Sequence, residues 1–199
     1  MFHEGYDILD GVAVASHGHV KSVFLAHQQP LEEIEIIHCD TASLTSVNLL
    51  RVLLAERGLR PDFMPLPDYA QATALENVLL IGNPGIDFLH APHPHTIWDL
   101  GAAWQELTDL PFVYAAWALR RGHHDAALRE YLRTTKTSGL EQLSKIIATH
   151  PDYDTAFRQA YLGGHIQYNL GKTEKAGLAK FVELLKTHGD QDVYKPTFV

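Results

Sequence analysis

Short apolar runs alternate with segments of helical spacing over the first 118 residues, and this alternation is the strongest constraint on the fold. Apolar runs bounded by Gly, Pro or Asp predict buried strands. Such strands are predicted at residues 11–15, 20–26, 34–38, 78–82 and 111–118. Strands that alternate with helices in this way indicate an α/β fold.

Helical spacing of apolar residues predicts the remaining elements. Helices are predicted at 45–57 with Gly58 as the cap, at 69–77, 99–107 and 125–132, from Ser138 with the capping box Ser138 and Glu141, and at 154–170 and 173–188. The segment 83–96, rich in Pro and His, is predicted to be a loop. Everything after residue 118 is thus predicted to be a helical region that packs on another part of the protein.

The composition excludes several classes of protein. A net charge of −8 and a pI near 5.9 argue against nucleic-acid binding, which needs a basic surface. The single cysteine, Cys39, excludes an internal disulfide framework, and its place at the end of a buried strand favours inert packing. No apolar run reaches the roughly 18 residues of a membrane span, and the first residues lack the pattern of a signal peptide. We therefore expect a cytoplasmic protein that binds no membrane.

Hydroxyl side chains gather in the stretch HCDTASLTSVNLL, where a predicted strand gives way to a helix. The N-terminus of a helix carries unpaired backbone N–H groups and about half a positive charge. With the hydroxyls of Ser43, Thr45 and Ser46, this turn becomes a site for a carboxylate or phosphate. The alternative is simple N-capping, for which one hydroxyl suffices. Three hydroxyls in four residues favour the anion site.

Two other turns carry candidate contacts. Ser16 and Gly18 lie between two predicted strands, where glycine lets the backbone approach a ligand closely. Asn83 follows the buried run VLLIG, at a position where open α/β sheets place ligand contacts. A plain turn without a ligand accounts for either segment equally well.

Histidines and aromatic residues offer weaker signals. The segment HAPHPH contains His90, His93 and His95, but its prolines hold it extended and no helix-borne pair or CxxC supports it, so no metal site is expected. His17 and His19 are expected to face solvent. The large aromatic residues expected in the core are Trp98, Trp104, Tyr114 and Trp117.

Several motifs occur in the order found in one enzyme family. The chain contains SHGHVKSVFL, HCDTASLTSVNLLRVLL, NVLLIGNPGI, WDLGAAWQELTDLPFVYAAWALR and YLGGHIQYNLGKTEKAGLAKF. From about Ile8 to Gly189 it resembles the chorismate dehydratases of the futalosine route to menaquinone. Two positions depart from the family pattern: Leu44 stands where an Arg is usual, and Asn83 stands where an Asp is usual. Each departure removes a charge.

The resemblance implies a type II periplasmic-binding-protein fold, with two α/β lobes around a cleft and a helical C-terminal region. Residues 1–15 and 111–199 would belong to lobe I, and residues 16–110 would form lobe II. Family members carry a further N-terminal portion of lobe I, which this chain is expected to lack. An apolar face left uncovered in this way would favour association, including homo-oligomers.

The resemblance also implies a hydro-lyase that converts chorismate to 3-[(1-carboxyvinyl)oxy]benzoate without a metal or an organic cofactor. The substrate's own enolpyruvyl carboxylate would take the proton. Ser43, Thr45 and Ser46 would bind a carboxylate, Ser16 would be the catalytic polar group at the ring, and Asn83 and Gly18 would contact the substrate. A non-catalytic solute-binding module for a small carboxylate is the alternative, and the dihydroxynaphthoate synthase of the same pathway is a third reading.

Overall fold

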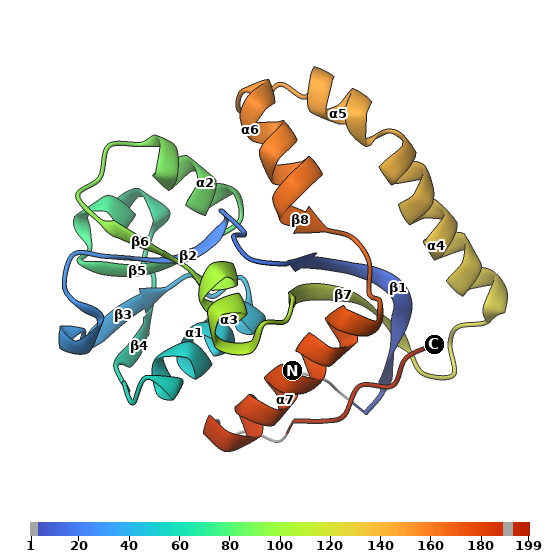
Figure 1. The fold of residues 1–199 in the computed structure, drawn as a ribbon, viewed down its shortest axis with the longest axis horizontal. Helices are drawn as coiled ribbons and strands as arrows, with labels where there is room; N and C mark the ends of the chain where they lie inside the picture. Colours follow the sequence, from blue (N-terminus) through green and yellow to red (C-terminus); the bar gives the residue numbers. More distant parts are fainter. Residues whose placement is uncertain (1–3, 189–192) are drawn as a thin grey trace.

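The computed structural model describes residues 4–188 and 193–199, and it contains two β-sheets surrounded by helices (Figure 1). The larger sheet has five strands in the order β4-β3-β5-β2-β6, and the smaller has three in the order β7-β1-β8. All strands of the larger sheet come from residues 23–99. The protein is therefore mixed α/β, as the sequence pattern predicts.

The bounds of the elements are as follows. The strands are β1 (Tyr6–Ser16), β2 (Val23–His27), β3 (Ile36–Cys39), β4 (Asp62–Pro65), β5 (Asn77–Ile81), β6 (Thr96–Asp99), β7 (Phe112–Arg120) and β8 (Ile166–Gln167). The α-helices are α1 (Leu44–Glu56), α2 (Asn83–His90), α3 (Leu100–Thr108), α4 (Ala126–Glu141), α5 (Leu143–Thr149), α6 (Thr155–Ala160) and α7 (Lys172–His188). Short 3₁₀ helices are η1 (Leu31–Glu33) and η2 (Tyr69–Ala74), and η3 (Tyr161–His165) is π-helical. Within the described ranges, no helix is both long and apolar enough to cross a membrane.

Strand β2 lies inside the five-stranded sheet, and helices cover both of its faces. Its side chains alternate between the faces, as in any strand. Val23 and Leu25 pack into a core with α1 and α3, whereas Phe24 and Ala26 pack into a separate core with α2. Strand β2 runs antiparallel to β5 and β6, while β3 runs parallel to β4 and β5. Because both faces are covered, β2 is a continuous apolar run in the sequence.

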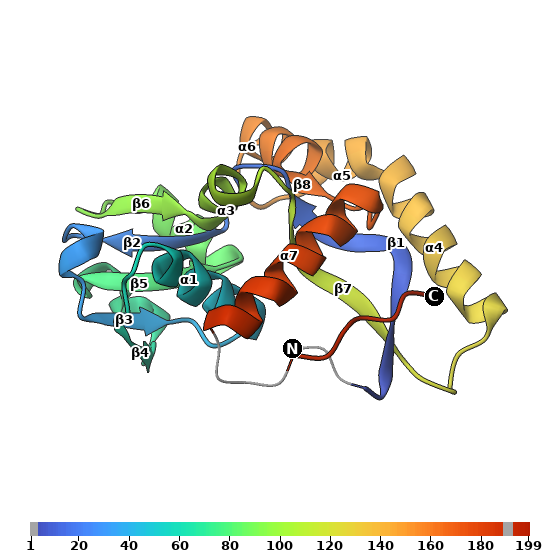
Figure 2. The same ribbon diagram turned by 60° about the horizontal axis from the view of Figure 1, so that its bottom comes forward.

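Two chain segments connect the sheets. Strands β1 and β7 pair antiparallel in the smaller sheet, and their register shifts between Ile8 and Ala13 and again between Val14 and Ala15. Strand β1 of the smaller sheet leads into β2 of the larger sheet, and α3 leads from the larger sheet back into β7 of the smaller one (Figure 2). The short strand β8 pairs only with the last two residues of β1. The end of β1 at Ser16 is therefore where the two sheets meet.

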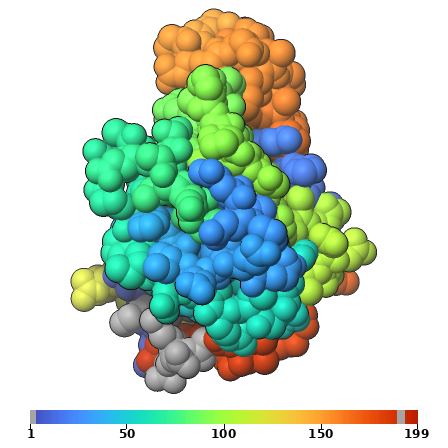
Figure 3. Space-filling model, turned by 90° about the vertical axis from the view of Figure 1, so that its left-hand side faces the viewer, coloured from blue at the N-terminus to red at the C-terminus, as the bar shows by residue number. Residues whose placement is uncertain are grey.

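Helix α7 packs across both connections. Phe181 and Leu185 lie in the largest core cluster together with Phe112 at the start of β7. A side-chain carbon at Gly177 would overlap the backbone carbonyl oxygen of Pro111, so only glycine allows this approach. Helices α4, α5 and α6 form an arc on the other side of β1, away from α7 (Figure 1). The α5–α6 segment projects beyond the body of the five-stranded sheet (Figure 3).

The prediction of a loop at residues 83–96 is confirmed only for residues 91–95 and is wrong for the rest. Helix α2 begins at Asn83, and β6 begins at Thr96. Pro84 in the first turn is compatible with a helix because the first N–H groups have no partner inside the helix anyway. Ile86 and Phe88 are buried, and this packing stabilises α2.

The helical region after residue 118 also differs from the prediction. Ser138 and Glu141 do not form a capping box, because both lie inside α4, whose N-cap is Asp125. The helix predicted at 154–170 ends at Ala160, passes through π-helical η3 and becomes strand β8. Pairing of Ile166 with Ser16 of β1 imposes this strand, and no local pattern signals it.

Candidate active site

Ser16 ends β1 and is almost fully buried where the two sheets meet. Its hydroxyl donates to the carbonyl oxygen of Gly18 at 3.1 Å and lies 3.1 Å from the hydroxyl of Tyr114 on β7. Gly18 has a φ of +92°, a backbone conformation that favours glycine, and the turn after Ser16 depends on it. Burial raises the pKa of Tyr114, which keeps its hydroxyl protonated and able to donate to Ser16.

The N-terminus of α3 packs directly on this turn. A side-chain carbon at Gly101 would lie 2.7 Å from the Tyr114 hydroxyl and 2.8 Å from the Ser16 hydroxyl. Asp99 caps α3 by accepting from the backbone N–H of Ala102, and it also accepts from the backbone N–H of Lys21 at 2.8 Å. Asp99 therefore ties the turn after Ser16 to α3. Sequence reasoning placed this aspartate as the first residue of the helix predicted at 99–107 and missed its role, although an aspartate at the start of a helix is a typical N-cap signal.

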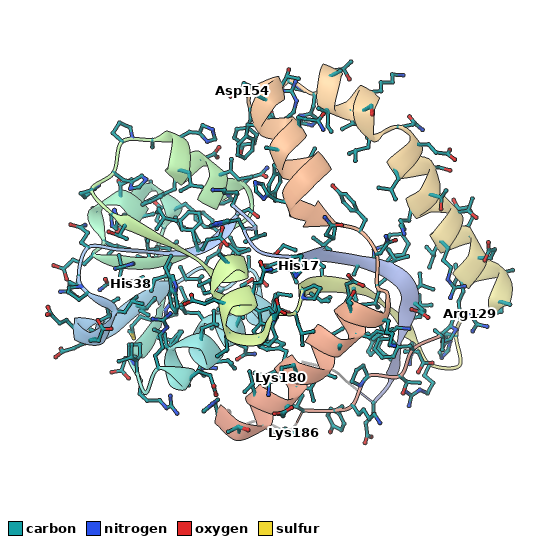
Figure 4. The ribbon with its side chains drawn as sticks, viewed as in Figure 1. His17, His38, Arg129, Asp154, Lys180 and Lys186 are labelled. Carbon is teal, nitrogen blue, oxygen red and sulfur yellow. The ribbon has the colours of Figure 1, made fainter. Side chains whose placement is uncertain are left out.

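Three histidines lie nearby, two in the turn after Ser16 and one in η3. His17 is exposed and lies beside α3 near the centre of the molecule (Figure 4). The ring of His19 lies 3.8 Å from Asp99. Burial lowers the pKa of His165, and the neighbouring charge of Lys21 lowers it further, so His165 favours the neutral form.

The hydroxyl cluster lies at the start of α1, as predicted. Ser43 is the N-cap and accepts from the backbone N–H of Ser46 at 3.3 Å, and the two hydroxyls lie 3.2 Å apart. Ser46 is buried, Thr45 is half-buried and Leu44 is 55% exposed. Ser43 is therefore an N-cap, which is the alternative that the sequence left open. The structure leaves the hydroxyls of Thr45 and Ser46 without any further protein partner among the described residues.

Asp40 lies between β3 and this cluster and was not singled out from the sequence. Its side chain is buried, one oxygen accepts from the backbone N–H of Ala42 at 2.9 Å, and the other has no partner among the described residues. Burial raises the pKa of Tyr69, and the neighbouring Asp40 carboxylate raises it further. The sequence signal that could have identified Asp40 is its position directly after a buried strand.

Asn83 is exposed as the first residue of α2. The turn before it is held against β2, because Gly82 donates its backbone N–H to Ser22 at 2.7 Å. The Ser22 hydroxyl accepts from Tyr161 of η3 at 2.9 Å. Sequence reasoning missed Tyr161, because no local sequence pattern predicts a π-helical turn.

The predicted residues thus fall into three groups at strand ends. Ser16 and Gly18 share one network with Tyr114, Ser43 and Ser46 share another, and Asn83 lies at the end of β5. Within the described ranges, no hydrogen bond joins one group to another. Each group follows the carboxyl end of a strand, which is where open α/β sheets place ligands.

The histidine-rich segment has structural roles. The His90 ring bonds to the carbonyl oxygen of Ile86 at 2.8 Å, His93 stacks on Phe88, and the His95 ring bonds to the carbonyl oxygen of Leu75 at 2.6 Å. Among the residues that the structure describes, no group of three or more His, Cys, Asp or Glu side chains is arranged to hold a metal.

Cys39 and the large aromatic residues were expected in the interior. Burial raises the pKa of Cys39 to about 12, so the thiol stays protonated at neutral pH. Trp104 is fully buried, as expected. Trp117 is not in the core: its side chain is 40% exposed on β7.

Known proteins are similar to this chain in sequence and in fold. The family model described as menaquinone biosynthesis matches residues 1–187. A chorismate dehydratase from Thermus thermophilus is 32% identical over 202 residues, which cover 89% of this chain and 73% of the relative. A crystal structure of a protein from Archaeoglobus fulgidus has a TM-score of 0.62 at 19% identity, covering 94% of this chain and 74% of that one. An ABC transporter structure from Parabacteroides distasonis has a TM-score of 0.57 at 16% identity, covering 92% and 68%. At these identities the two structures show a common fold alone.

Proposed function

Because this chain belongs to the menaquinone biosynthesis family, we propose that it is a chorismate dehydratase, a hydro-lyase that converts chorismate to 3-[(1-carboxyvinyl)oxy]benzoate. The observation that carries the proposal is the 32% identity to the Thermus thermophilus chorismate dehydratase over 89% of the chain. The hydroxyl turn of α1, the Ser16 turn and the VLLIG strand all lie inside the family match at residues 1–187.

The proposed arrangement has two lobes around a cleft. Residues 1–15 and 111–199 would contribute to one lobe, and residues 16–110 would form the other. Two separate sheets and two connecting segments support this arrangement, as does the likeness of the fold to an ABC transporter structure. Chorismate would lie between the lobes, at the strand ends that carry Ser16, the start of α1 and Asn83.

The start of α1 would hold a carboxylate of the substrate. The side chains of Thr45 and Ser46 and the first N–H groups of the helix offer donors, and the helix dipole favours a negative charge there. Leu44 would leave this site without the guanidinium that the family usually has, so the hydroxyls and backbone carry more of the binding. Asn83 would contact the substrate as a neutral group, and Gly18 would let the backbone approach it.

Ser16 would act at the reacting ring. Elimination breaks one C–O and one C–H bond and makes the ring aromatic, so the chemistry is strongly downhill once the groups are aligned. The substrate's enolpyruvyl carboxylate takes the proton from the ring carbon and passes it to the leaving hydroxide, which departs as water. In the substrate complex the Ser16 hydroxyl would turn its one proton from the Gly18 carbonyl to the departing oxygen, and Tyr114 would orient Ser16 by donating to it.

Mass spectrometry tests the reaction directly. We expect chorismate incubated with the protein and a chelator to give a product lighter by one water, and we expect Ser16→Ala to slow this conversion while the protein stays folded. A folded protein that binds chorismate and never releases the dehydrated product would contradict the proposal. That outcome would instead identify a non-catalytic binding module for a small carboxylate.

A further inference from the structure

Helix α2 is clamped at its C-terminal end by aromatic side chains from a distant part of the chain. The hydroxyl of Tyr153 donates to Asp87 of α2 at 2.9 Å, and the Tyr153 ring stacks on His90 with 5.5 Å between the ring centroids. The ring of Phe157 meets the same His90 ring edge-on at 5.1 Å. Asp87 and His90 are not buried against the sheet, so these contacts hold the opposite face of the helix.

A chain of hydrogen bonds holds the N-terminal end of α2. The hydroxyl of Tyr161 donates to the hydroxyl of Ser22 at 2.9 Å, and Ser22 is buried directly before β2. The carbonyl oxygen of Ser22 accepts from the backbone N–H of Gly82 at 2.7 Å. Gly82 is the N-cap of α2, and Asn83 follows it. Through Ser22, Tyr161 therefore holds the turn that carries the proposed substrate contact.

Tyr153, Phe157 and Tyr161 form a row of rings, called the aromatic row below. They are spaced four residues apart, a spacing that favours contacts along one side of a helix. The ring centroids of Tyr153 and Phe157 lie 5.3 Å apart, and those of Phe157 and Tyr161 lie 5.6 Å apart. Because each ring packs on the next, the aromatic row connects the contacts at the two ends of α2.

The turn that presents Tyr153 is strained, and a buried arginine holds it. Tyr153 has a φ of +59°, a left-handed conformation that is costly for a residue with a bulky side chain. Arg158 is buried and donates to the carbonyl oxygens of Ile147 at 2.6 Å and of Asp152 at 3.0 Å. It also donates to the carbonyl oxygen of Tyr153 itself. Asp154, the N-cap of α6, marks this turn in Figure 4. The surrounding structure thus maintains a strained turn whose side chain reaches α2.

The contacts at the two ends of α2 together fix the position of Asn83. Strain that the surrounding structure maintains indicates a functional constraint. We propose that Tyr161 and Tyr153 are positioning residues of the candidate active site, which hold α2 and so place Asn83 for the substrate. This role rests on the proposed function, in which Asn83 contacts chorismate. Binding is sensitive to small displacements of a contacting group, so loosening either end of α2 weakens it.

Steady-state kinetics of Tyr161→Phe test this role, because the substitution removes one hydroxyl and keeps the ring in the aromatic row. We expect KM for chorismate to rise about fivefold, the effect of one neutral hydrogen bond. We expect kcat to change by less than about twofold, because Asn83 binds substrate and transition state alike. Tyr168→Phe is the matched control, since its hydroxyl donates to Leu162 at 3.0 Å, outside these contacts. A folded Tyr161→Phe protein with unchanged KM would overturn the proposal.

Combined variants test whether Tyr161 acts through Asn83. In an Asn83→Ala background the proposed substrate contact is gone, so we expect Tyr161→Phe to leave KM unchanged there. Ser22→Ala removes the acceptor of the Tyr161 hydroxyl and should raise KM as much as Tyr161→Phe does, and the two together should raise it no further. A similar rise of KM with and without Asn83 would mean that Tyr161 acts independently of Asn83, which overturns the proposal.

Hydrogen exchange tests the hold on α2 without relying on activity. We expect Tyr161→Phe to speed exchange at the Gly82 amide, which bonds to Ser22, and Tyr153→Phe to speed exchange in the last turn of α2. Exchange in α7 should stay as in the wild type. A protein that converts no chorismate would contradict the proposed function alone. Exchange then decides the role of the two tyrosines: faster exchange at these amides supports it, and unchanged exchange in both variants overturns it.

Discussion

The hydroxyl of Ser16 on β1 lies 3.1 Å from the hydroxyl of Tyr114 on β7, across the two segments that connect the sheets. Ser16 donates onward to the carbonyl of Gly18, so the tyrosine is the donor within this pair. The proposed reacting group is thus positioned by a residue 98 positions away in the sequence. Both residues belong to strands of the smaller sheet, so the register of β1 against β7 sets this contact.

Tyr114→Phe is expected to lower kcat by about tenfold, the effect of roughly 1.4 kcal/mol in the transition state. The ring stays in place, so the melting temperature should change little. Steady-state kinetics beside thermal denaturation provide both values. Tyr168→Phe is the control, because its hydroxyl donates to Leu162 at 3.0 Å outside the candidate site. A loss of stability with unchanged kcat in Tyr114→Phe would assign Tyr114 a structural role alone.

Thr45→Val and Ser46→Ala are each expected to weaken chorismate binding by about 10- to 100-fold. The reason is that a hydrogen bond to a charged acceptor contributes roughly 1.5–3 kcal/mol. Ser43→Ala serves for comparison, because loss of an N-cap costs about 1 kcal/mol of stability. Titration calorimetry with the product, beside thermal denaturation, separates the effects. If all three variants lower only the melting temperature, the hydroxyls are caps and bind no substrate.

The start of α1 shows what the sequence predicts well. The apolar spacing and Gly58, whose φ is +77°, are local signals, and each lies where the pattern predicts it. The helix begins one residue earlier than predicted, with Ser43 as its N-cap. The buried strands β2 and β5 were equally predictable from the sequence, because strands of a sheet covered on both faces are continuous apolar runs. Helix α2 was missed because Pro84 was read as a loop signal, although proline is compatible with a first turn.

The candidate site was only partly predictable. Ser16 and Gly18 stand out as a turn, but the pairing of Ser16 with Tyr114 depends on strand register, and Tyr114 was expected simply in the core. Strand β8 and the π-helical turn that carries Tyr161 form because the chain meets β1 and Ser22 there. Such long-range contacts leave no periodic pattern in the sequence.

Gly101→Ala is expected to be strongly destabilising and to reduce activity further than its stability loss explains. The added carbon would overlap the backbone carbonyl oxygen of Gly18 and would lie 2.7 Å from the Tyr114 hydroxyl and 2.8 Å from the Ser16 hydroxyl, so both the turn and the pair must shift. Gly139→Ala is the control, because its site is open and alanine should stabilise α4 by up to about 1 kcal/mol. Denaturant titration and kinetics give the two quantities. Normal activity in a folded Gly101→Ala protein would show that the contact is not needed.

Asp7 is expected to contribute an acid-sensitive part of the stability. Its carboxylate, at the start of β1, lies 2.8 Å from Arg121 and 3.0 Å from His124. Hydrogen bonds from Arg121 and then His124 lower the pKa of Asp7 in the folded state. A carboxylate with a lowered folded pKa stabilises the protein above its unfolded pKa, about 3.9, and loses that stabilisation as the pH falls from there through the lower folded pKa. Asp7→Asn should therefore be less stable than the wild type at pH 7 and close to it near pH 2. Denaturant titrations across this range decide the point, since a stability difference that does not vary with pH would mean that the charge of Asp7 is not what stabilises the strand.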